Sequence, residues 1–266
     1  MTELTSGYAP VNGVDMYFES VGEGGVPVVL THGGYGLTTM LADVRDELCP
    51  DRRVLSVELQ GHGHTADIDR PFRYESFGDD LAAFVEHLGL DQVDLVGYSL
   101  GGGASLRATI QHPDVVRRLA LISTPFRREA WFPDIRAQMA QMSSALFDQF
   151  KQTPLYPAYA AVAPDVDGFR ALIDKTGDLL RTEYDWSDEV RAITTPTLLV
   201  FADADSMPTS EMARNFGLLG GGQADGNFDG SSPSPMRLAV LPGRTHYNVT
   251  ATPGLGSVVR QFLDAT

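Results

Sequence analysis

Short runs of consecutive apolar residues recur along the chain, and stretches with a helical repeat separate them. The runs cover residues 26–30, 53–57, 93–97, 119–122, 197–201 and 237–241. Continuous apolar runs bounded by turn residues are typical of strands buried on both faces of a parallel sheet. An earlier segment, 14–20, alternates imperfectly between apolar and polar residues, as a strand near a sheet edge does.

Apolar residues at intervals of three and four predict helices between these strands. The helical stretches cover residues 38–48, 75–88, 100–111 and 209–219. Strands that alternate with helices imply right-handed crossovers and a sheet covered by helices on both faces. The pattern therefore predicts an α/β fold with a mostly parallel, doubly wound sheet.

One long segment, 126–192, interrupts this alternation. It contains no strand-like run, it is rich in aromatic residues, and several prolines divide it into short helices. We interpret it as an inserted helical cap over a core formed by residues 1–125 and 193–266. A glycine-rich stretch at 220–232 has the composition of a surface loop.

Composition and charge exclude several classes of partner. The 266 residues include 20 Lys and Arg against 35 Asp and Glu, a net charge of −15, which argues against nucleic acid and anionic membranes as partners. Cys49 is the single cysteine, so the chain has neither an intramolecular disulfide nor a cysteine-based zinc site. The first residues lack a secretory signal and no run of about 20 apolar residues exists, so we expect a cytoplasmic protein. We expect the protein to be a monomer or a homodimer.

The strongest chemical signal is Gly97-Tyr98-Ser99-Leu100-Gly101, which joins a predicted strand to a predicted helix. This is the G-x-S-x-G pattern in the strand–turn–helix context that exposes a nucleophilic serine. Glycines two residues to either side let the backbone pass the turn without a Cβ clash. We therefore expect Ser99 to be a nucleophile.

A nucleophilic serine needs a base, and the base needs an orienting acid. Of the six histidines, His246 follows the last predicted strand, at the sheet edge where α/β proteins hold their ligands. Asp205 follows the preceding strand and is the preferred acid, with Asp203 as the alternative. The order Ser99, Asp205, His246 is the one associated with α/β-hydrolases.

The loop after the first buried strand, 31–36, is rich in glycine and can bring a backbone N–H close to Ser99. Its Gly34 N–H and the N–H of Leu100, at the start of the helix after Ser99, are candidates for an oxyanion hole. We expect His32 to hold this loop in place rather than to act as a base.

A metal site is the competing interpretation of the loop that contains His62 and His64, with Asp67 nearby. A His-x-His pair is a weak signal, and the chain has neither an HExxH motif nor a cysteine cluster. We therefore expect no metal site and no cofactor, and we place this loop near the rim of a pocket.

Taken together, the motifs resemble the α/β-hydrolase superfamily, in particular its cap-bearing, serine-esterase-like branch. The resemblance spans 14–263 and rests on the segments 32–34, 58–65, 97–101, 202–205 and 243–246. Many relatives have aspartate where Glu58 stands, and arginine or proline where Gln60 stands. The loop at 220–232 is also longer than usual. Relatives that act as haloalkane dehalogenases or epoxide hydrolases have aspartate at the position of Ser99.

The resemblance implies a serine hydrolase that cleaves a carboxylic ester or lactone of a small hydrophobic substrate through an acyl-enzyme. Aromatic residues of the cap and beside the serine are the expected substrate contacts, namely Tyr35, Tyr98, Trp131, Phe132, Tyr156 and Tyr159. The same triad also fits a C–C bond hydrolase, an amidase, a perhydrolase or an acyltransferase. A ligand receptor with negligible turnover and an inactive relative are the alternatives outside catalysis.

Overall fold

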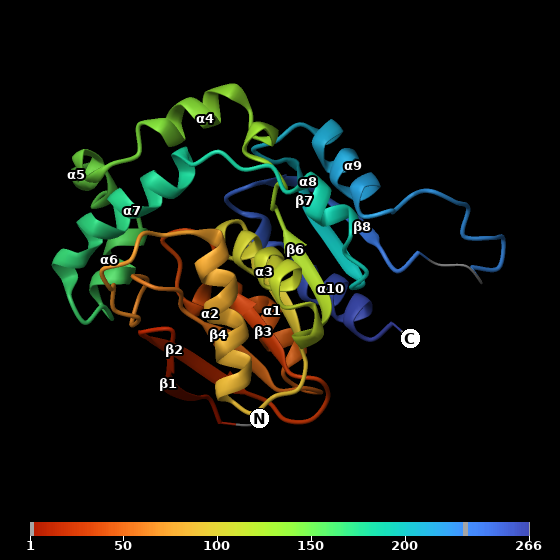
Figure 1. The fold of residues 1–266 in the computed structure, drawn as a ribbon, viewed down its shortest axis with the longest axis horizontal. Coiled ribbons are helices and arrows are strands. Elements are labelled where there is room, and N and C mark those ends of the chain that lie inside the picture. Colours follow the sequence, from red (N-terminus) through yellow and green to blue (C-terminus); the bar gives the residue numbers. More distant parts are fainter. Residues whose placement is uncertain (1–2, 231–233, 266) are drawn as a thin grey trace.

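The computed structural model describes residues 3–230 and 234–265, and within them eight strands form one twisted sheet (Figure 1). The order across the sheet is β1, β2, β4, β3, β5, β6, β7, β8. All neighbours from β4 to β8 are parallel, whereas β2 runs antiparallel to both β1 and β4. The strands are β1 (Thr5–Val11), β2 (Val14–Val21), β3 (Val28–Thr31), β4 (Val54–Val57), β5 (Val93–Tyr98), β6 (Val116–Ile122), β7 (Thr197–Ala204) and β8 (Arg237–Thr245).

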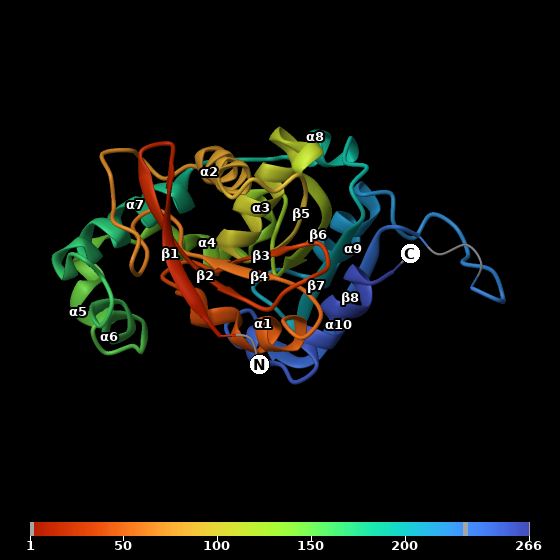
Figure 2. The ribbon, with the colours of Figure 1, turned by 90° about the horizontal axis from the view of Figure 1, so that it is seen from below.

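Helices cover both faces of the sheet (Figure 2). Helices α1 (Ala42–Leu48) and α10 (Leu255–Leu263) contribute to one apolar cluster, and α2 (Tyr74–His87), α3 (Leu100–Gln111) and α9 (Thr209–Leu218) contribute to the other. Consecutive residues of β5 enter opposite clusters, as Leu95 and Val96 do, because side chains alternate across a strand. Burial on both faces explains why these strands are continuous apolar runs, and the predicted doubly wound sheet is confirmed.

Two elements were not predicted from the sequence pattern. Strand β1 contains Gly7 and Pro10, and its side chains at Ala9 and Val11 are buried while its other residues are exposed or half-buried. Such a strand carries too few apolar residues for its alternation to be visible. Helix α10 does show apolar positions at helical spacing, so its sequence was sufficient to predict it.

The segment 126–192 is helical, with α4 (Pro133–Ala140), α5 (Phe147–Phe150), α6 (Leu155–Ala160), α7 (Phe169–Arg181) and α8 (Ser187–Arg191). Figure 1 shows α4 to α7 grouped on one side of the sheet, away from α10. Lys175 of α7 attaches this group to the core, because its Nζ lies 2.6 Å from Oδ2 of Asp67 and donates to the Ile68 carbonyl at 2.6 Å. The limits of a cap at 126 and 192 stay a prediction.

The glycine-rich loop begins after α9 and projects from the sheet beside β8 (Figure 1). Its described part, 220–230, includes the fully exposed side chain of Phe228. Ser231 and Ser232, which complete the predicted loop, lie outside the described residues. Among the residues that are described, no helix is long and apolar enough to cross a membrane.

Candidate active site

Ser99 occupies a sharp turn between β5 and α3. Its backbone has φ 52° and ψ −113°, in the left-handed half of conformational space that residues with a Cβ rarely adopt. Two hydrogen bonds hold the turn, since the Ser99 N–H donates to the Ile122 carbonyl at 2.9 Å and Gly103 N–H donates to the Ser99 carbonyl at 3.0 Å. The strained turn fixes where the Ser99 side chain leaves the backbone.

The glycines of the motif are required because other backbone passes close by. A Cβ on Gly97 would lie 2.4 Å from the Gly101 carbonyl oxygen, and a Cβ on Gly101 would lie 2.3 Å from that of His32. Both distances are shorter than real Cβ contacts. The spacing G-x-S-x-G therefore follows from the close approach of α3 to β5 and to the loop after β3.

His246 lies between Ser99 and a buried carboxylate. Its Nε2 is 3.0 Å from the Ser99 Oγ, and its Nδ1 is 2.9 Å from Oδ1 of Asp205. Asp205 follows β7 and His246 follows β8, so all three residues reach the same edge of the sheet from the carboxyl ends of strands. The Tyr98 hydroxyl donates to the His246 carbonyl at 2.6 Å and fixes the histidine loop to the serine turn.

The Asp205 carboxylate accepts three further hydrogen bonds. They come from the Ser123 hydroxyl at 2.5 Å and from the N–H groups of Ser206 and Ala202 at 2.8 and 3.2 Å. Burial alone would raise the pKa of this carboxyl, but His246 and the other donors together lower it below its ordinary value. Asp205 is therefore a carboxylate at neutral pH, able to orient the imidazole and to stabilise its protonated form.

The alternative acid, Asp203, has a different place in the structure. Its side chain is exposed and accepts a hydrogen bond from the Arg244 N–H at 3.2 Å. The N–H groups of Gly243 and Arg244 lower the pKa of its carboxyl. Asp203 thus fixes the turn in β8, and the structure pairs His246 with Asp205 instead.

Two backbone N–H groups are available beside Ser99. Gly34 and Leu100 line the same pocket as Ser99 and His246, and neither N–H has a protein acceptor within the described residues. Leu100 opens α3, so its N–H belongs to the helix end that carries partial positive charge. These donors are suited to stabilise an oxyanion.

His32 has the positioning place that the sequence predicts. Its Nδ1 donates to the Gly33 carbonyl at 2.7 Å, because its Nε2 accepts from the Leu59 N–H at 3.1 Å. Burial, and to a smaller extent His62, lower the pKa of His32 to about 3, so the ring is neutral. A neutral His32 connects the loop after β3 to the loop after β4.

A cavity of about 440 Å³ opens beside Ser99. The aromatic and apolar residues that line it come from the segment after β3, from the start of α2, from the end of β5, from the segment 126–192 and from the loop after β8. They include Tyr35, Met40, Tyr74, Tyr98, Trp131, Ile135, Met139, Met142, Phe150, Leu155, Leu180, Tyr184, Trp186 and Tyr247. No Lys, Arg, Asp or Glu is among the described residues of this lining.

Three of the six expected substrate contacts line this cavity, and three do not. Tyr35, Tyr98 and Trp131 are part of the lining, whereas Phe132, Tyr156 and Tyr159 are not. Phe132 is half-exposed on the surface. The rings of Tyr156 and Tyr159 pack on Phe169, with centroids 5.2 and 5.0 Å away. We do not retain these three as substrate contacts.

The loop that contains His62 and His64 is held in place by Glu58. The buried carboxylate of Glu58 accepts hydrogen bonds from the N–H groups of Thr38 and His64 at 3.1 and 2.6 Å, and lies 3.0 Å from the His64 Nδ1. Burial lowers the pKa of His62 to about 4. The part of the chain that the structure describes contains no group of three potential metal ligands.

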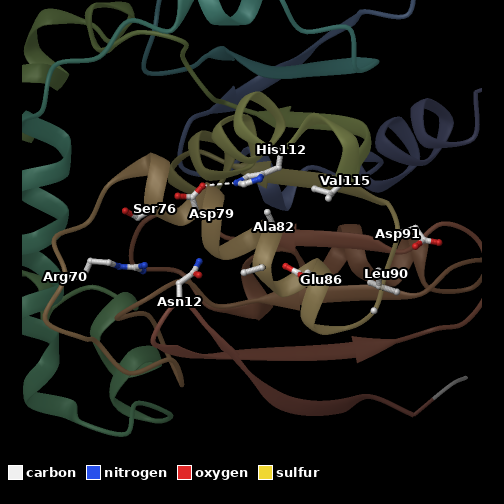
Figure 3. A pocket seen from close by; sticks show the side chains of 12 residues that line it. Asn12, Arg70, Ser76, Asp79, Ala82, Glu86, Leu90, Asp91, His112 and Val115 are labelled. Carbon is white, nitrogen blue, oxygen red and sulfur yellow. Dashed lines mark hydrogen bonds and ion pairs between the residues drawn. The ribbon is translucent and has the colours of Figure 1, made fainter.

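A second hollow, of about 930 Å³, lies on the outer surface along α2 (Figure 3). Figure 3 shows His112 beside Asp79, and the His112 Nε2 lies 2.8 Å from Oδ1 of Asp79. Arg70 pairs with Asp80, whose side chain is buried, at 2.5 Å. The residues that line the hollow do not include Ser99, His246 or Asp205.

The comparisons with known proteins agree with this geometry. Residues 26–222 match the family described as alpha/beta hydrolase fold. The chain belongs to this family. The matched residues of this α/β-hydrolase include strands β3 to β7 and the serine turn.

Curated relatives of this α/β-hydrolase have different activities. A proline iminopeptidase of Clostridioides difficile is 30% identical over 148 residues, which are 53% of this chain and 50% of that protein. A 2-hydroxy-6-oxo-2,4-heptadienoate hydrolase of Pseudomonas putida is 41% identical over 117 residues, 41% of each chain. The chain thus spans half or less of these relatives' length.

Solved structures match over the whole fold at lower identity. An esterase from Thermogutta terrifontis has a TM-score of 0.74 at 21% identity, covering 98% of both chains. An enol-lactonase from Burkholderia xenovorans has a TM-score of 0.70 at 23% identity, covering 97% of this chain and 100% of that one. At these identities, the likeness establishes the fold.

Several residues of the site were not predicted. Ser123 directly follows β6, so its position at the carboxyl edge of the sheet was the signal that could have indicated it. Thr176 and Leu180 of α7, Met139 of α4 and Met142 just after α4 line the cavity through the tertiary placement of those helices. No local pattern in the sequence specifies that placement.

Proposed function

We propose that this α/β-hydrolase is a serine hydrolase that cleaves a carboxylic ester or lactone of a small, uncharged, hydrophobic substrate. One observation carries the proposal. The hydrogen-bonded series Ser99, His246 and Asp205 opens into a cavity whose lining has no Lys, Arg, Asp or Glu among the described residues.

The proposed reaction has two halves. His246 takes the Ser99 proton as Oγ attacks the substrate carbonyl, and Asp205 holds the imidazole in the required tautomer. Protonated His246 then gives its proton to the leaving alkoxide, and an acyl group remains on Ser99. A water molecule activated by His246 releases the acid and restores Ser99, so no metal or organic cofactor takes part.

The developing oxyanion requires donors aimed at it. The Gly34 and Leu100 N–H groups are the donors we propose, and in comparable sites one such donor is worth about 3 kcal/mol of transition-state stabilisation. The helices of 126–192 act as a cap in this proposal, because α4 and α7 enclose the cavity on the side away from the sheet.

The uncharged lining favours esters over other substrates of the family. A substrate such as the dienoate named for one relative carries a carboxylate, which loses hydration in an apolar cavity and needs a cationic partner. The ammonium group at the amino terminus of a peptide needs an anionic partner for the same reason. Neither partner is among the described lining residues, so C–C hydrolysis of such acids and aminopeptidase activity are less well supported.

The test combines active-site labelling with turnover. A fluorophosphonate probe should modify Ser99, and p-nitrophenyl esters of short to medium chain length should be hydrolysed. Ser99→Ala and His246→Ala should each lower kcat by about 10⁴-fold or more, with unchanged circular dichroism as the control for folding. Labelling without turnover of any ester would contradict the ester proposal and favour acyl transfer or a receptor. No labelling would contradict the activated serine itself.

A further inference from the structure

A sulfur atom accepts a hydrogen bond from the loop that carries one of the proposed oxyanion donors. The N–H of Gly33, the residue before Gly34, donates to the Sδ of Met40 at 3.3 Å. Gly33 is buried, and a buried backbone N–H nearly always has an acceptor. The thioether of Met40 therefore takes a place that an oxygen atom usually fills.

The carbonyl of Gly33 is held as well. It accepts hydrogen bonds from the His32 Nδ1 at 2.7 Å and from the Gly36 N–H at 3.0 Å. Glycine has no Cβ to restrict its φ and ψ, so these bonds and the bond to Met40 fix the two peptide planes that meet at Gly33. Because a trans peptide is planar and its N–H points away from its C=O, the fixed Gly33 carbonyl sets the direction of the Gly34 N–H.

The sulfur of Met40 is itself fixed. Met40 lies in the single 3₁₀ turn Thr38–Leu41, and the Thr38 N–H at the start of this turn donates to the buried Glu58 carboxylate at 3.1 Å. A Cβ on Gly36 would lie 2.8 Å from the Met40 Sδ and 2.7 Å from its Cε. The thioether thus packs directly on the loop backbone, which removes much of the freedom of a methionine side chain.

Gly33 also packs on the serine turn. A Cβ on Gly33 would lie 2.7 Å from two ring carbons of Tyr98, the residue before Ser99, and 3.5 Å from the Met40 Sδ. Met40 lines the cavity together with Gly34, Tyr98 and Ser99. A shift of Gly33 would therefore change how the Gly34 N–H is placed relative to the nucleophile.

We propose that Met40 is a positioning residue for the oxyanion hole. Its Sδ holds the Gly33 N–H, and the loop held in this way directs the Gly34 N–H at the developing oxyanion. The inference rests on the proposed function, because it needs a reaction in which Ser99 forms an oxyanion. Met40 is then more than part of the apolar wall, since a hydrocarbon side chain of the same size would fill the cavity but accept no hydrogen bond.

The experiment compares Met40→Leu with Met139→Leu, which removes a sulfur from the same cavity lining but from α4 rather than from the loop. Two inhibitors separate positioning from packing. A trifluoromethyl ketone forms a tetrahedral adduct with Ser99 and carries an oxyanion, whereas the corresponding secondary alcohol fills the cavity without one.

The two variants should differ in the ratio of the two inhibition constants. For Met40→Leu, kcat with a p-nitrophenyl ester should fall about tenfold at nearly unchanged KM, and the Ki of the ketone should rise about tenfold while that of the alcohol stays within about twofold. Met139→Leu should change the affinity for both inhibitors by the same factor, so the ratio of their Ki values should not change.

Three results would overturn the proposal. Met40→Leu raises KM at unchanged kcat, or weakens both inhibitors equally, or changes only the thermal stability. If Met40→Leu does not fold, norleucine incorporation replaces each methionine sulfur by a methylene group and keeps the unbranched shape. The norleucine protein should then bind the ketone more weakly relative to the alcohol, and an unchanged ratio would contradict the role of the sulfur.

Failure of the proposed function can be told apart from failure of this inference. Attack of Ser99 on a fluorophosphonate expels fluoride and places negative charge on an oxygen that the oxyanion hole binds. If no ester is hydrolysed, Met40→Leu should still slow this labelling about tenfold, and equal rates would contradict the positioning role. A Ser99 that the probe does not label would contradict both proposals, because no oxyanion would form for the loop to meet.

Discussion

The Ser123 hydroxyl donates a 2.5 Å hydrogen bond to Oδ2 of Asp205, and His246 engages Oδ1 of the same carboxylate. Ser123 follows β6 and Asp205 follows the neighbouring β7, so the bond joins the carboxyl ends of two adjacent strands. The backbone of Ser123 is strained, with φ 51°, like that of Ser99. The carboxylate that faces His246 is thus held from behind.

Removing this support should weaken both activity and stability. A hydrogen bond to a charged group contributes about 1.5–3 kcal/mol, and Ser123→Ala leaves Oδ2 of the buried Asp205 without it. We expect the free energy of unfolding in urea to fall by about that amount, and kcat to fall about tenfold because the imidazole is less well oriented. Ser56→Ala is the control, since the buried Ser56 hydroxyl has no partner in the described chain. Equal effects of the two substitutions would contradict the role of Ser123.

Asp203, near the end of β7, and Asp205, directly after this strand, should differ sharply. Asp205→Asn replaces an acceptor by an amide that favours the wrong tautomer of His246, so kcat should fall by about 10⁴-fold. Asp203→Asn changes an exposed side chain that accepts from the Arg244 N–H, and kcat should change less than about threefold. Steady-state kinetics of both variants with one p-nitrophenyl ester checks this, and the reverse order would make Asp203 the acid.

Acid should destabilise the protein through two buried histidines. The pKa of His32 is about 3 and that of His62 about 4 in the folded chain, against about 6.5 in the unfolded chain. Below pH of about 6.5 the unfolded state therefore binds more protons, so stability is present above that pH and is lost as the pH falls toward the folded values. Each histidine should contribute a loss of about 1.4 kcal/mol per pH unit.

Urea unfolding at about pH 7, 6 and 5 measures this dependence. His62→Asn keeps a donor toward the Gln60 carbonyl, which accepts from His62 Nδ1 at 3.0 Å, but does not titrate. Unfolding of this variant should take up about one proton fewer. Its unfolding free energy should therefore fall by about 1.4 kcal/mol less for each pH unit. An unchanged slope would show that His62 is protonated in the folded state. Asp205 acts at lower pH, because its folded pKa is depressed below the usual carboxyl value, so its contribution is lost only as the pH falls through that value.

Two glycine substitutions should change stability in opposite directions. A Cβ on Gly101 would lie 2.3 Å from a backbone oxygen, so Gly101→Ala has to displace the serine turn and should cost more than about 2 kcal/mol along with most activity. A Cβ on Gly217, inside α9, meets nothing within 4 Å, so Gly217→Ala should add about 0.5–1 kcal/mol. Thermal unfolding compares them. A tolerated Gly101→Ala would contradict the close packing of the turn.

The sequence predicts those parts of the molecule that local physics determines. The apolar runs identify six of the parallel strands because burial on both faces leaves little freedom of composition. Ser99 and His246 are predicted because a tight turn needs glycine and because parallel strands end at one edge. The choice between Asp203 and Asp205 needed the structure, since the two residues lie two positions apart at the end of β7 and only the folded chain shows which side chain reaches His246.

The residues that line the cavity could not all be predicted from local sequence patterns. Tyr156 and Trp131 are both aromatic residues of the helical segment, yet Trp131 packs edge-on against His246 at 5.2 Å while Tyr156 packs on Phe169. Which face a short helix buries depends on the elements it docks against. Strand β1 was missed for a related reason, because its contribution is backbone pairing to β2, and pairing has no signature in side-chain type.

Strand β8 lies at the end of the sheet and pairs, within the described residues, with β7 alone. His246 follows it directly, whereas Ser99 is carried by the central strand β5. An edge strand therefore leads to the base, whereas the nucleophile follows a strand that is paired on both sides. Local opening of β8 would take His246 away from Ser99 while the serine turn and the cavity walls remain folded. Loss of catalysis on warming should precede loss of the fold, and activity should return as quickly as one strand re-pairs.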